Sequence, residues 1–201
     1  MGTNNTFSKL KEQEREIRRI LILDAAERVF AQTPFTDVNM RSIAREAGIS
    51  PASIYTYFSD QETLFVEAYL RRSQDVLNLL DELIQTDGET LLRKVSDAYI
   101  EYFTEHDVYF RMMAHFMLYA KLNPSSLEKL NTMERALLDM FDRVFRKSGF
   151  TEDVRFHSHT FFAALNGILI SFRKYPGRSE KDVITHMKRL AAIVTRTFMQ
   201  R

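Results

Sequence analysis

The sequence predicts an all-α fold of about nine helices, and three observations lead to this prediction. Glycine and proline are scarce, with 6 Gly and 4 Pro among 201 residues, so few of the turns that join strands can form. Apolar residues recur at helical spacing, as in Ile22, Ala25, Ala26 and Val29. The alternating pattern that is typical of strands is not evident. A composition of 45% hydrophobic and 27% charged residues is that of a globular protein with a real core.

Composition also narrows the class of protein and its compartment. The chain has no cysteine, hence no disulfide framework, thiolate nucleophile or cysteine zinc site, and we expect it in the reducing cytoplasm. No apolar run reaches the roughly 18 residues that cross a bilayer, and the first residues do not resemble a signal peptide, so no membrane partner is expected. The net charge of +1 by itself indicates neither nucleic acid nor membrane.

Local signals set the boundaries of the first helices. Pro34 cannot continue a hydrogen-bonded helix and ends the first one. Asn39 is a favourable N-cap for the second helix, and Gly48 suits the left-handed position after it. Ser50 and Pro51 read as the N-cap and first residue of the third helix. The helices expected from these signals span about 7–32, 39–48 and 51–58.

The remaining helices follow from similar signals. Ser59 and Glu62 form a capping box ahead of a fourth helix that runs to about residue 84. The polar stretch 85–88 contains a glycine and is the best domain boundary. Five more helices are expected after it, at about 89–104, 108–121, 125–147, 152–174 and 180–199.

The stretch 39–58 is the most informative part of the chain. Two helices of about two turns, joined by three residues, cannot lie antiparallel and must cross steeply, as in a helix-turn-helix. Ala44 lies where they would cross, and the residues spaced to face the first helix are Ile43, Ala47, Ile49 and Ile54. Small and hydroxyl side chains on the outer face suit entry into the major groove of DNA. The same spacing also fits a tight corner in an ordinary helical bundle.

Charge gives only local support for a nucleic-acid partner. Residues 1–58 contain eight Lys and Arg against seven Asp and Glu, a net charge of +1. Two basic pairs, Lys9 with Lys11 and Arg18 with Arg19, lie on the N-terminal arm and first helix, where they could meet phosphate.

Several spaced blocks of this region resemble the DNA-binding domain of the TetR family of repressors. The blocks are 22–26, Phe30, 40–50, 53–58 and 62–65, which agree in order over a quarter to a third of the chain. The resemblance implies an all-helical dimer that binds a palindromic operator and is released by a small molecule bound in its C-terminal domain. It implies a DNA-binding domain with an N-terminal arm at 1–58, a connecting helix at 59–84, and a ligand-binding and dimerisation domain at 85–201.

The resemblance also implies roles for single residues. Arg41 corresponds to a second-helix residue that reaches a base or phosphate, and Tyr55 to a tyrosine that contacts phosphate. The predicted DNA-binding residues are Arg41, Ser42, Pro51, Ala52, Ser53, Tyr55, Thr56, Tyr57 and Gln61. At Gln61 the family usually has a lysine; because glutamine releases no counterion, we expect a slightly shallower salt dependence unless the basic arm restores the charge. Ala52 replaces a common glycine.

The second half of the chain is rich in Phe and Met. Such residues at helical spacing form either a filled core or an adaptable cavity for an apolar ligand, and both interpretations stay open. With the resemblance, a small hydrophobic effector of aromatic or acyl character is expected. The predicted ligand-binding residues are Tyr102, Met113, Phe116, Met117, Met140, Phe162 and Asn166.

A dimer interface is expected on the last two helices. Small residues recur at every fourth position of the eighth helix, and an apolar face follows the ninth. These residues either pack against each other within one chain or form a four-helix interface about a two-fold axis, which the resemblance favours. The predicted dimerisation residues are Ala163, Gly167, Ser171, Ile184, Met187, Ala191, Val194 and Phe198.

Other classes of function receive less support. An enzyme would need a nucleophile with a base, paired carboxylates in a pocket, a metal cluster or a phosphate-binding loop, and none is evident, so a helical enzyme is a weak alternative. His157 and His159 are two apart and cannot hold one metal ion, so neither a metal nor a cofactor is expected. A helix-turn-helix dimer that answers to a protein partner, or to no effector, is the other alternative.

Overall fold

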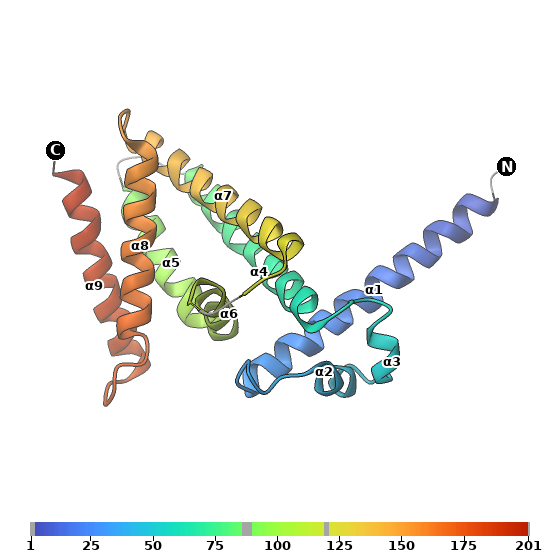
Figure 1. Cartoon of the computed structure of the whole chain (residues 1–201). Helices are drawn as coiled ribbons and strands as arrows, with labels where there is room; N and C mark the ends of the chain where they lie inside the picture. Colours follow the sequence, from blue (N-terminus) through green and yellow to red (C-terminus); the bar gives the residue numbers. More distant parts are fainter. Residues whose placement is uncertain (1–2, 86–89, 119–120, 201) are drawn as a thin grey trace. The chain divides into compact units, whose positions relative to one another are not determined.

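The computed structural model describes residues 3–85, 90–118 and 121–200, and within these ranges the chain forms nine α-helices and no strand (Figure 1). The prediction of an all-α fold is therefore confirmed. The helices are α1 (Thr3–Gln32), α2 (Met40–Glu46), α3 (Pro51–Ile54), α4 (Gln61–Ile84), α5 (Leu91–Glu105), α6 (Asp107–Leu118), α7 (Pro124–Lys147), α8 (Val154–Phe172) and α9 (Glu180–Met199). Among these helices, none combines the length and apolarity that crossing a membrane requires. Most of the predicted boundary at 85–88 lies outside the described residues.

The third helix is shorter than predicted. It ends at Ile54, whereas the sequence pattern suggested a helix as far as Phe58. The backbone N–H of Thr56 donates to the carbonyl of Ser53, three residues back, at 3.1 Å. The hydroxyl of Thr56 donates to the same carbonyl at 2.7 Å, and bonds of this kind compete with the helical pattern. The residues after Ile54 therefore form a tight turn that leads into α4.

The cap of α4 also differs from the prediction. Oδ1 of Asp60, not the hydroxyl of Ser59, accepts a hydrogen bond of 2.7 Å from the backbone N–H of Thr63. The hydroxyl of Ser59 donates to the other carboxylate oxygen of Asp60 at 2.9 Å. Glu62 does not complete a capping box, because its Oε1 accepts the backbone N–H of Asn123 at 3.0 Å. The predicted capping box of Ser59 and Glu62 is therefore wrong. The N-cap is Asp60, one residue after the predicted Ser59.

The contacts divide the chain into two compact units. Unit 1 contains residues 1–70 and 122–126, and unit 2 contains 71–121 and 127–201. The division falls inside α4, whereas the sequence suggested that 59–84 form a connecting helix between two domains. Unit 1 has a core of α1, α2 and α3 with the first turns of α4, in which Phe30 and Phe65 meet edge to face with centroids 4.9 Å apart.

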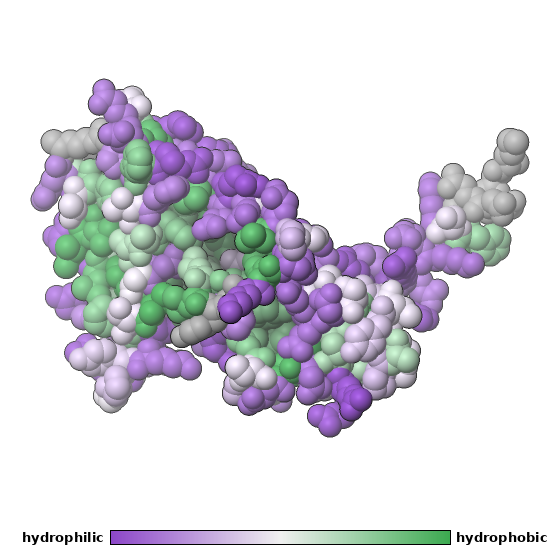
Figure 2. Space-filling model, in the orientation of Figure 1, coloured by the Kyte–Doolittle hydropathy of each residue, from purple (hydrophilic) through white to green (hydrophobic). Residues whose placement is uncertain are grey.

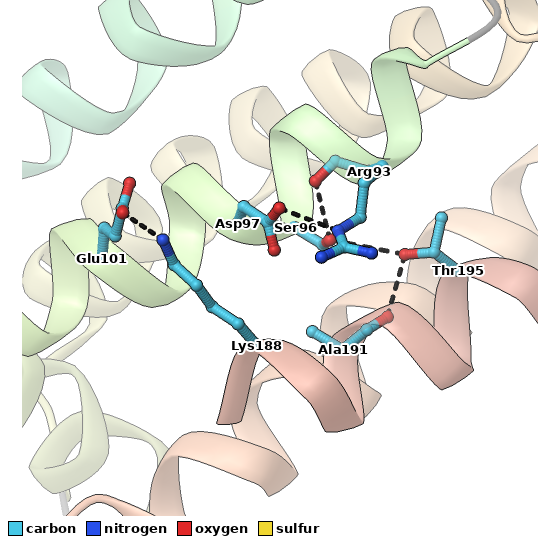
Figure 3. A network of polar contacts seen from close by, with 7 residues as sticks. All are labelled: Arg93, Ser96, Asp97, Glu101, Lys188, Ala191 and Thr195. Carbon is cyan, nitrogen blue, oxygen red and sulfur yellow. Dashed lines mark hydrogen bonds and ion pairs between the residues drawn. The ribbon is translucent and has the colours of Figure 1, made fainter. Parts of the chain in front are cut away.

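Unit 2 is organised around α5, which packs against α9, α8 and α6. Small side chains let α5 and α9 approach closely: Ser96, Ala191 and Thr195 are all buried. Figure 3 shows how polar groups cross this contact, with the hydroxyl of Thr195 donating to that of Ser96 at 3.4 Å and Lys188 forming an ion pair with Glu101. These two polar contacts fix the position of α5 along α9.

Candidate nucleic-acid interface

The turn between α2 and α3 is built from local signals that the sequence carries. Oδ1 of Asn39 accepts the backbone N–H of Ser42 at 3.0 Å, which caps α2. Gly48 has φ +68°, a left-handed conformation that costs glycine little, and it allows the N–H of Ile49 to reach the carbonyl of Ala44 at 3.0 Å. The hydroxyl of Ser50 then caps α3 by accepting the N–H of Ser53 at 3.0 Å.

Burial under this turn follows the predicted pattern in part. Ile43, Ala44 and Ile54 are fully buried, so they hold α2 and α3 against the rest of unit 1. Ala47 and Ile49 are only half-buried. The outer faces of α2 and α3 are therefore left for other contacts.

The predicted DNA-binding residues lie on this outer side. Five are exposed and four are half-buried. The exposed residues are Arg41, Pro51, Ala52, Tyr55 and Thr56, and the half-buried residues are Ser42, Ser53, Tyr57 and Gln61. Two of the serines already make local bonds: the hydroxyl of Ser42 donates to the carbonyl of Asn39 at 2.7 Å, and the hydroxyls of Ser53 and Ser50 share a bond of 2.7 Å. Each hydroxyl oxygen keeps capacity for a further bond.

Three predicted residues from separate elements meet on one concave surface. Arg41 from α2, Tyr55 from the turn after α3 and Gln61 from the first turn of α4 line an open hollow of about 480 Å³, together with Asn39, Met40 and Asp60. A guanidinium, a phenol and an amide all donate hydrogen bonds, which is what a phosphate oxygen accepts.

Asp60 brings a negative charge into the same hollow. The N–H of Thr63 holds the pKa of its carboxyl below the usual value, so the group is ionised at neutral pH. Both of its oxygens are engaged, one by Thr63 and one by Ser59, and the carboxylate also lies at the positive end of the α4 dipole. The hollow therefore contains one cation, one anion and three neutral side chains with donors, Asn39, Tyr55 and Gln61.

A second concave surface of unit 1 lies between α1 and the turn after α3. It has a volume of about 420 Å³, and Thr56 and Tyr57 line one side of it. Lys11, Glu14, Arg15 and Arg18 of α1 line the other side. The basic pairs that the sequence indicated as phosphate contacts included Lys11 and Arg18 but not Arg15.

The predicted ligand-binding residues differ in burial and in contacts within unit 2. Phe162 and Asn166 lie together on α8, where the amide of Asn166 donates to the carbonyl of Phe162 at 2.9 Å. Tyr102 stacks on His106 with centroids 4.1 Å apart, and its hydroxyl donates to the carbonyl of Arg72 at 3.4 Å. The others range from buried Met113, through half-buried Phe116 and Met140, to exposed Met117.

Two residues of this region were missed by the sequence patterns. Tyr99 is buried between Asn166 and the rings of Phe103 and Phe141. Arg173 is also largely buried, with a side chain only 8% exposed, an ion pair of 2.9 Å to Asp107, and a pKa lowered by its burial. Tyr99 and Arg173 both lie in stretches with apolar residues at helical spacing. Only the tertiary fold shows that their polar atoms are buried.

The predicted dimerisation residues divide into two sets. Ala163, Gly167 and Ser171 are exposed, and a Cβ added at Gly167 would meet no atom of its own chain within 4 Å. Met187 and Ala191 are fully buried, so they belong to the core of unit 2 and not to the surface where we placed them. Ile184, Val194 and Phe198 are half-buried. The apolar face of α9 thus points mainly inward, toward α5 and α8.

The described surface of α8 and α9 is nevertheless apolar in part. Phe156 is 72% exposed, and Ile170 and Ile193 are half exposed. Figure 2 shows apolar residues gathered over these two helices. Within the described ranges, no three His, Asp or Glu side chains are grouped so that they could hold a metal ion.

Comparison with known proteins bears on the class of this fold. Residues 22–68 match the family model described as bacterial regulatory proteins, tetR family. An uncharacterized HTH-type transcriptional regulator of Haemophilus influenzae is 30% identical over 104 residues, which are 50% of each chain. One from Mycobacterium tuberculosis is 41% identical over 63 residues, or 31% of each chain. The aligned regions thus span half or less of these curated relatives.

Solved structures resemble the chain over most of its length. The transcriptional regulator FadR from Bacillus subtilis, solved in complex with stearoyl-CoA, has a TM-score of 0.70 at 17% identity, covering 88% of this chain and 97% of that one. The fatty acid degradation regulator FadR from Bacillus halodurans has a TM-score of 0.72 at 18% identity, covering 89% and 94%. At this level of identity, the likeness concerns the fold.

The capped helices α2 and α3, joined by a short turn and with exposed outer faces, form a helix-turn-helix motif. The match of residues 22–68 covers this motif together with most of the core of unit 1. Over residues 22–68 the chain is similar to the tetR family of bacterial regulatory proteins, and over most of its length it has the fold of solved transcriptional regulators.

Proposed function

We propose that the protein is a sequence-specific repressor that binds a palindromic DNA operator as a dimer and is released by a small hydrophobic effector. The observation that carries DNA binding is the hollow lined by Arg41, Tyr55 and Gln61, next to the exposed face of α3. Three separate elements supply donors to one surface there. The protein acts where the DNA is, in the cytoplasm, and by binding rather than by catalysis.

The chemistry of this surface fits the two parts of DNA recognition. Pro51, Ala52 and Ser53 are small, so α3 can bring its backbone close to base edges in the major groove. Tyr55 and Gln61 would donate to phosphate oxygens and fix the position of the helix on the duplex. Arg41 has the length and the two-pronged donor geometry to reach either a phosphate or the O6 and N7 of a guanine.

The exposed residues of α8 and α9 support a dimer. Ala163, Gly167 and Ser171 form a narrow strip without bulky side chains, and Ile170 and Ile193 add apolar surface beside it. Gly167 packs against nothing in its own chain, so its small size is explained by a partner helix that approaches closely. Two such pairs of helices about a two-fold axis would form a four-helix interface.

The effector would bind in unit 2. The Phe and Met side chains of unit 2 suit an acyl or aromatic compound, and a regulator of the same fold has been solved with stearoyl-CoA. A path to unit 1 is provided by residues 122–126, which follow α6 and belong to unit 1. There the N–H of Asn123 donates to Glu62, next to Gln61, so a movement of α6 would reach the start of α4.

Selection of binding sequences from random duplexes tests the DNA-binding part of this proposal. We expect the wild-type protein to enrich a sequence with two-fold symmetry. Arg41→Ala should weaken binding to that sequence by about 1–3 kcal/mol and relax its specificity if Arg41 contacts a guanine. If Arg41 contacts only phosphate, all sequences should weaken equally. Lys181→Ala, which removes an exposed charge from α9, is the control and should bind as the wild type does.

No enrichment of any sequence by the wild-type protein would contradict the proposal. An enriched sequence that is bound equally well by Arg41→Ala would move the recognition surface away from the hollow. A protein that binds DNA but shows no thermal shift with acyl or aromatic compounds would instead favour a helix-turn-helix dimer without a small-molecule effector.

A further inference from the structure

The second concave surface of unit 1, between α1 and the turn after α3, has its own chemistry. It is open, with a volume of about 420 Å³, and every residue that lines it carries a charge or a hydroxyl group. Three of these residues are basic and one is acidic. The lining residues are Lys11, Glu14, Arg15, Arg18, Thr56 and Tyr57. This surface is the α1 groove.

The basic residues of the α1 groove share one face of α1. The spacing of Lys11, Arg15 and Arg18 is four and three residues, which places them in a row along the helix. Ile22, four residues beyond Arg18, continues this row and is buried in the core of unit 1. The face that packs against the core near the middle of α1 therefore becomes a basic face further toward its N-terminus. Lys9 is two residues from Lys11 and lies on another side of the helix.

Tyr57 ties this basic face to the helix-turn-helix. Tyr57 and Arg18 line the groove together, and the neighbouring phenol and the charge of Glu14, whose carboxylate lies 2.5 Å from the guanidinium, raise the pKa of Arg18. Arg18 thus places a positive charge beside Tyr57 and Thr56, two residues already predicted to contact DNA. The α1 groove is therefore continuous with the turn that follows α3.

Lys11 and Arg15, the other two cations of the groove, form no ion pair with the described residues. Lys11 and Arg15 are exposed, and within the described part of the chain neither has a carboxylate within 4 Å. Arg19 is different, since it pairs with Glu67 and lies over the ring of Phe58 at 5.4 Å. Of the basic pair expected from the sequence, Arg18 therefore lines the groove, whereas Arg19 makes contacts within unit 1.

We propose that the α1 groove is a second binding site for the DNA backbone, separate from the hollow at Arg41, Tyr55 and Gln61. The inference rests on the proposed function and extends its contact surface to the first half of α1. At about 1.5 Å per residue, Lys11 and Arg18 lie about 10 Å apart along the helix. One DNA strand presents a phosphate about every 3.4 Å of its axis, so this row matches a short run of phosphates. The hydroxyls of Thr56 and Tyr57 add neutral donors.

The salt dependence of DNA affinity tests this inference without knowledge of the operator. The probe is a duplex of arbitrary sequence, because phosphate contacts are independent of sequence. For the double variant Lys11→Gln/Arg15→Gln, we expect the slope of log affinity against log salt to become shallower by about 2 for each bound subunit. The sequence preference found by selection should stay unchanged, since phosphate contacts do not read bases.

Lys9→Gln is the matched control, because it removes one charge from the same helix but from another face. It should change the slope by clearly less than either single variant, Lys11→Gln or Arg15→Gln. Circular dichroism should show the same helix content in all of these proteins, since the three side chains are exposed.

The outcomes separate this inference from the proposed function. A wild-type protein that binds DNA while the double variant keeps the wild-type slope would overturn the α1 groove as a DNA site and leave the proposed function standing. The same holds if Lys9→Gln changes the slope as much as Lys11→Gln does, because the effect would then be one of net charge. A wild-type protein that binds no duplex at low salt would overturn both.

Discussion

The hydroxyl of Tyr99 donates a hydrogen bond of 3.2 Å to Oδ1 of Asn166, and this bond joins α5 to α8 inside unit 2. The amide nitrogen of Asn166 donates to the carbonyl of Phe162 at 2.9 Å, so both ends of the amide are engaged within the chain. Asn166 was predicted to orient a ligand. Its contacts give it a structural role in holding the two helices together, whether or not a ligand also reaches it.

Replacement of Asn166 by Leu should therefore destabilise the free protein. The variant keeps the side-chain volume but leaves the buried hydroxyl of Tyr99 without its acceptor, which typically costs about 1–3 kcal/mol in the free energy of unfolding. Urea denaturation measures this cost. In the double variant Tyr99→Phe/Asn166→Leu, the unpaired hydroxyl is gone, so the loss should be smaller than the sum of the two single losses. Additive losses would show that the bond contributes nothing.

Asp60 should stabilise α4 in a pH-dependent way. Its folded pKa lies below its ordinary value of 3.8, chiefly because the N–H of Thr63 bonds to the ionised form. The stabilisation is therefore present above the unfolded pKa and is lost as the pH falls through the folded pKa. Asp60→Ala should cost about 0.5–2 kcal/mol at neutral pH, as for the loss of an N-cap, and less once the pH has fallen below the folded pKa. Denaturation curves at several pH values measure the difference.

Asp37→Ala is the comparison for Asp60, because it removes an exposed carboxylate from the turn before α2, where it caps no helix. It should change the stability little at any pH. A cost for Asp60→Ala that stays constant down to low pH would mean that the carboxylate does not act through its charge.

Gly167→Leu should dissociate the proposed dimer without unfolding the chain. A Cβ added at this position meets no atom from elsewhere in its own subunit within 4 Å, and leucine favours a helix more than glycine does. In the interface the added bulk would force the partner helix away, and overpacking typically costs about 1–3 kcal/mol per site. Analytical ultracentrifugation should show monomers at concentrations where the wild type is dimeric. These monomers should remain folded.

Thr132→Leu adds the same side chain to an exposed position of α7 and should leave the association state unchanged. If Gly167→Leu sediments as a dimer like the wild type, the interface lies elsewhere than on this strip of α8.

Effector and operator should weaken each other's binding by the same factor. The proposed release requires that the effector prefers a shape of the protein that binds DNA poorly, and such coupling is reciprocal, typically 5- to 150-fold. Calorimetric titration of a long-chain acyl compound with and without the selected duplex measures the factor. Glu62→Leu, which removes the acceptor for the N–H of Asn123, should reduce it. Equal affinity of the wild type in both titrations would exclude control by that compound.

Sequence patterns predicted the elements of the helix-turn-helix because each of its signals is local. Asn39, Gly48 and Ser50 act on backbone groups within a few residues, so their effect can be judged without the fold. The end of α3 could not be judged in this way. There Thr56 bonds back to Ser53, and the chain turns before the helix completes a second turn.

Which side of an amphipathic helix meets solvent could not be predicted where both sides have apolar residues. The periodicity of α9 identified Met187 and Ala191 as one face, but only the packing against α5 shows that this face is internal. Gly167 was placed on an exposed strip, and the structure agrees for that residue. Hollows made by several helices, such as the one that joins Arg41, Tyr55 and Gln61, depend on the tertiary fold and leave no continuous pattern in the sequence.

Footprinting of the DNA that flanks the gene for this protein is the most direct test of sequence-specific binding by a dimer. The two helix-turn-helix units of one dimer should protect a stretch with two-fold symmetry, whose two halves are centred about 34 Å apart or a multiple of that distance. Arg41→Ala should remove the protection at the protein concentration that protects fully in the wild type. The absence of any protected palindrome, both in this DNA and in sequences selected from the whole genome, would contradict the proposal that this protein is a sequence-specific repressor.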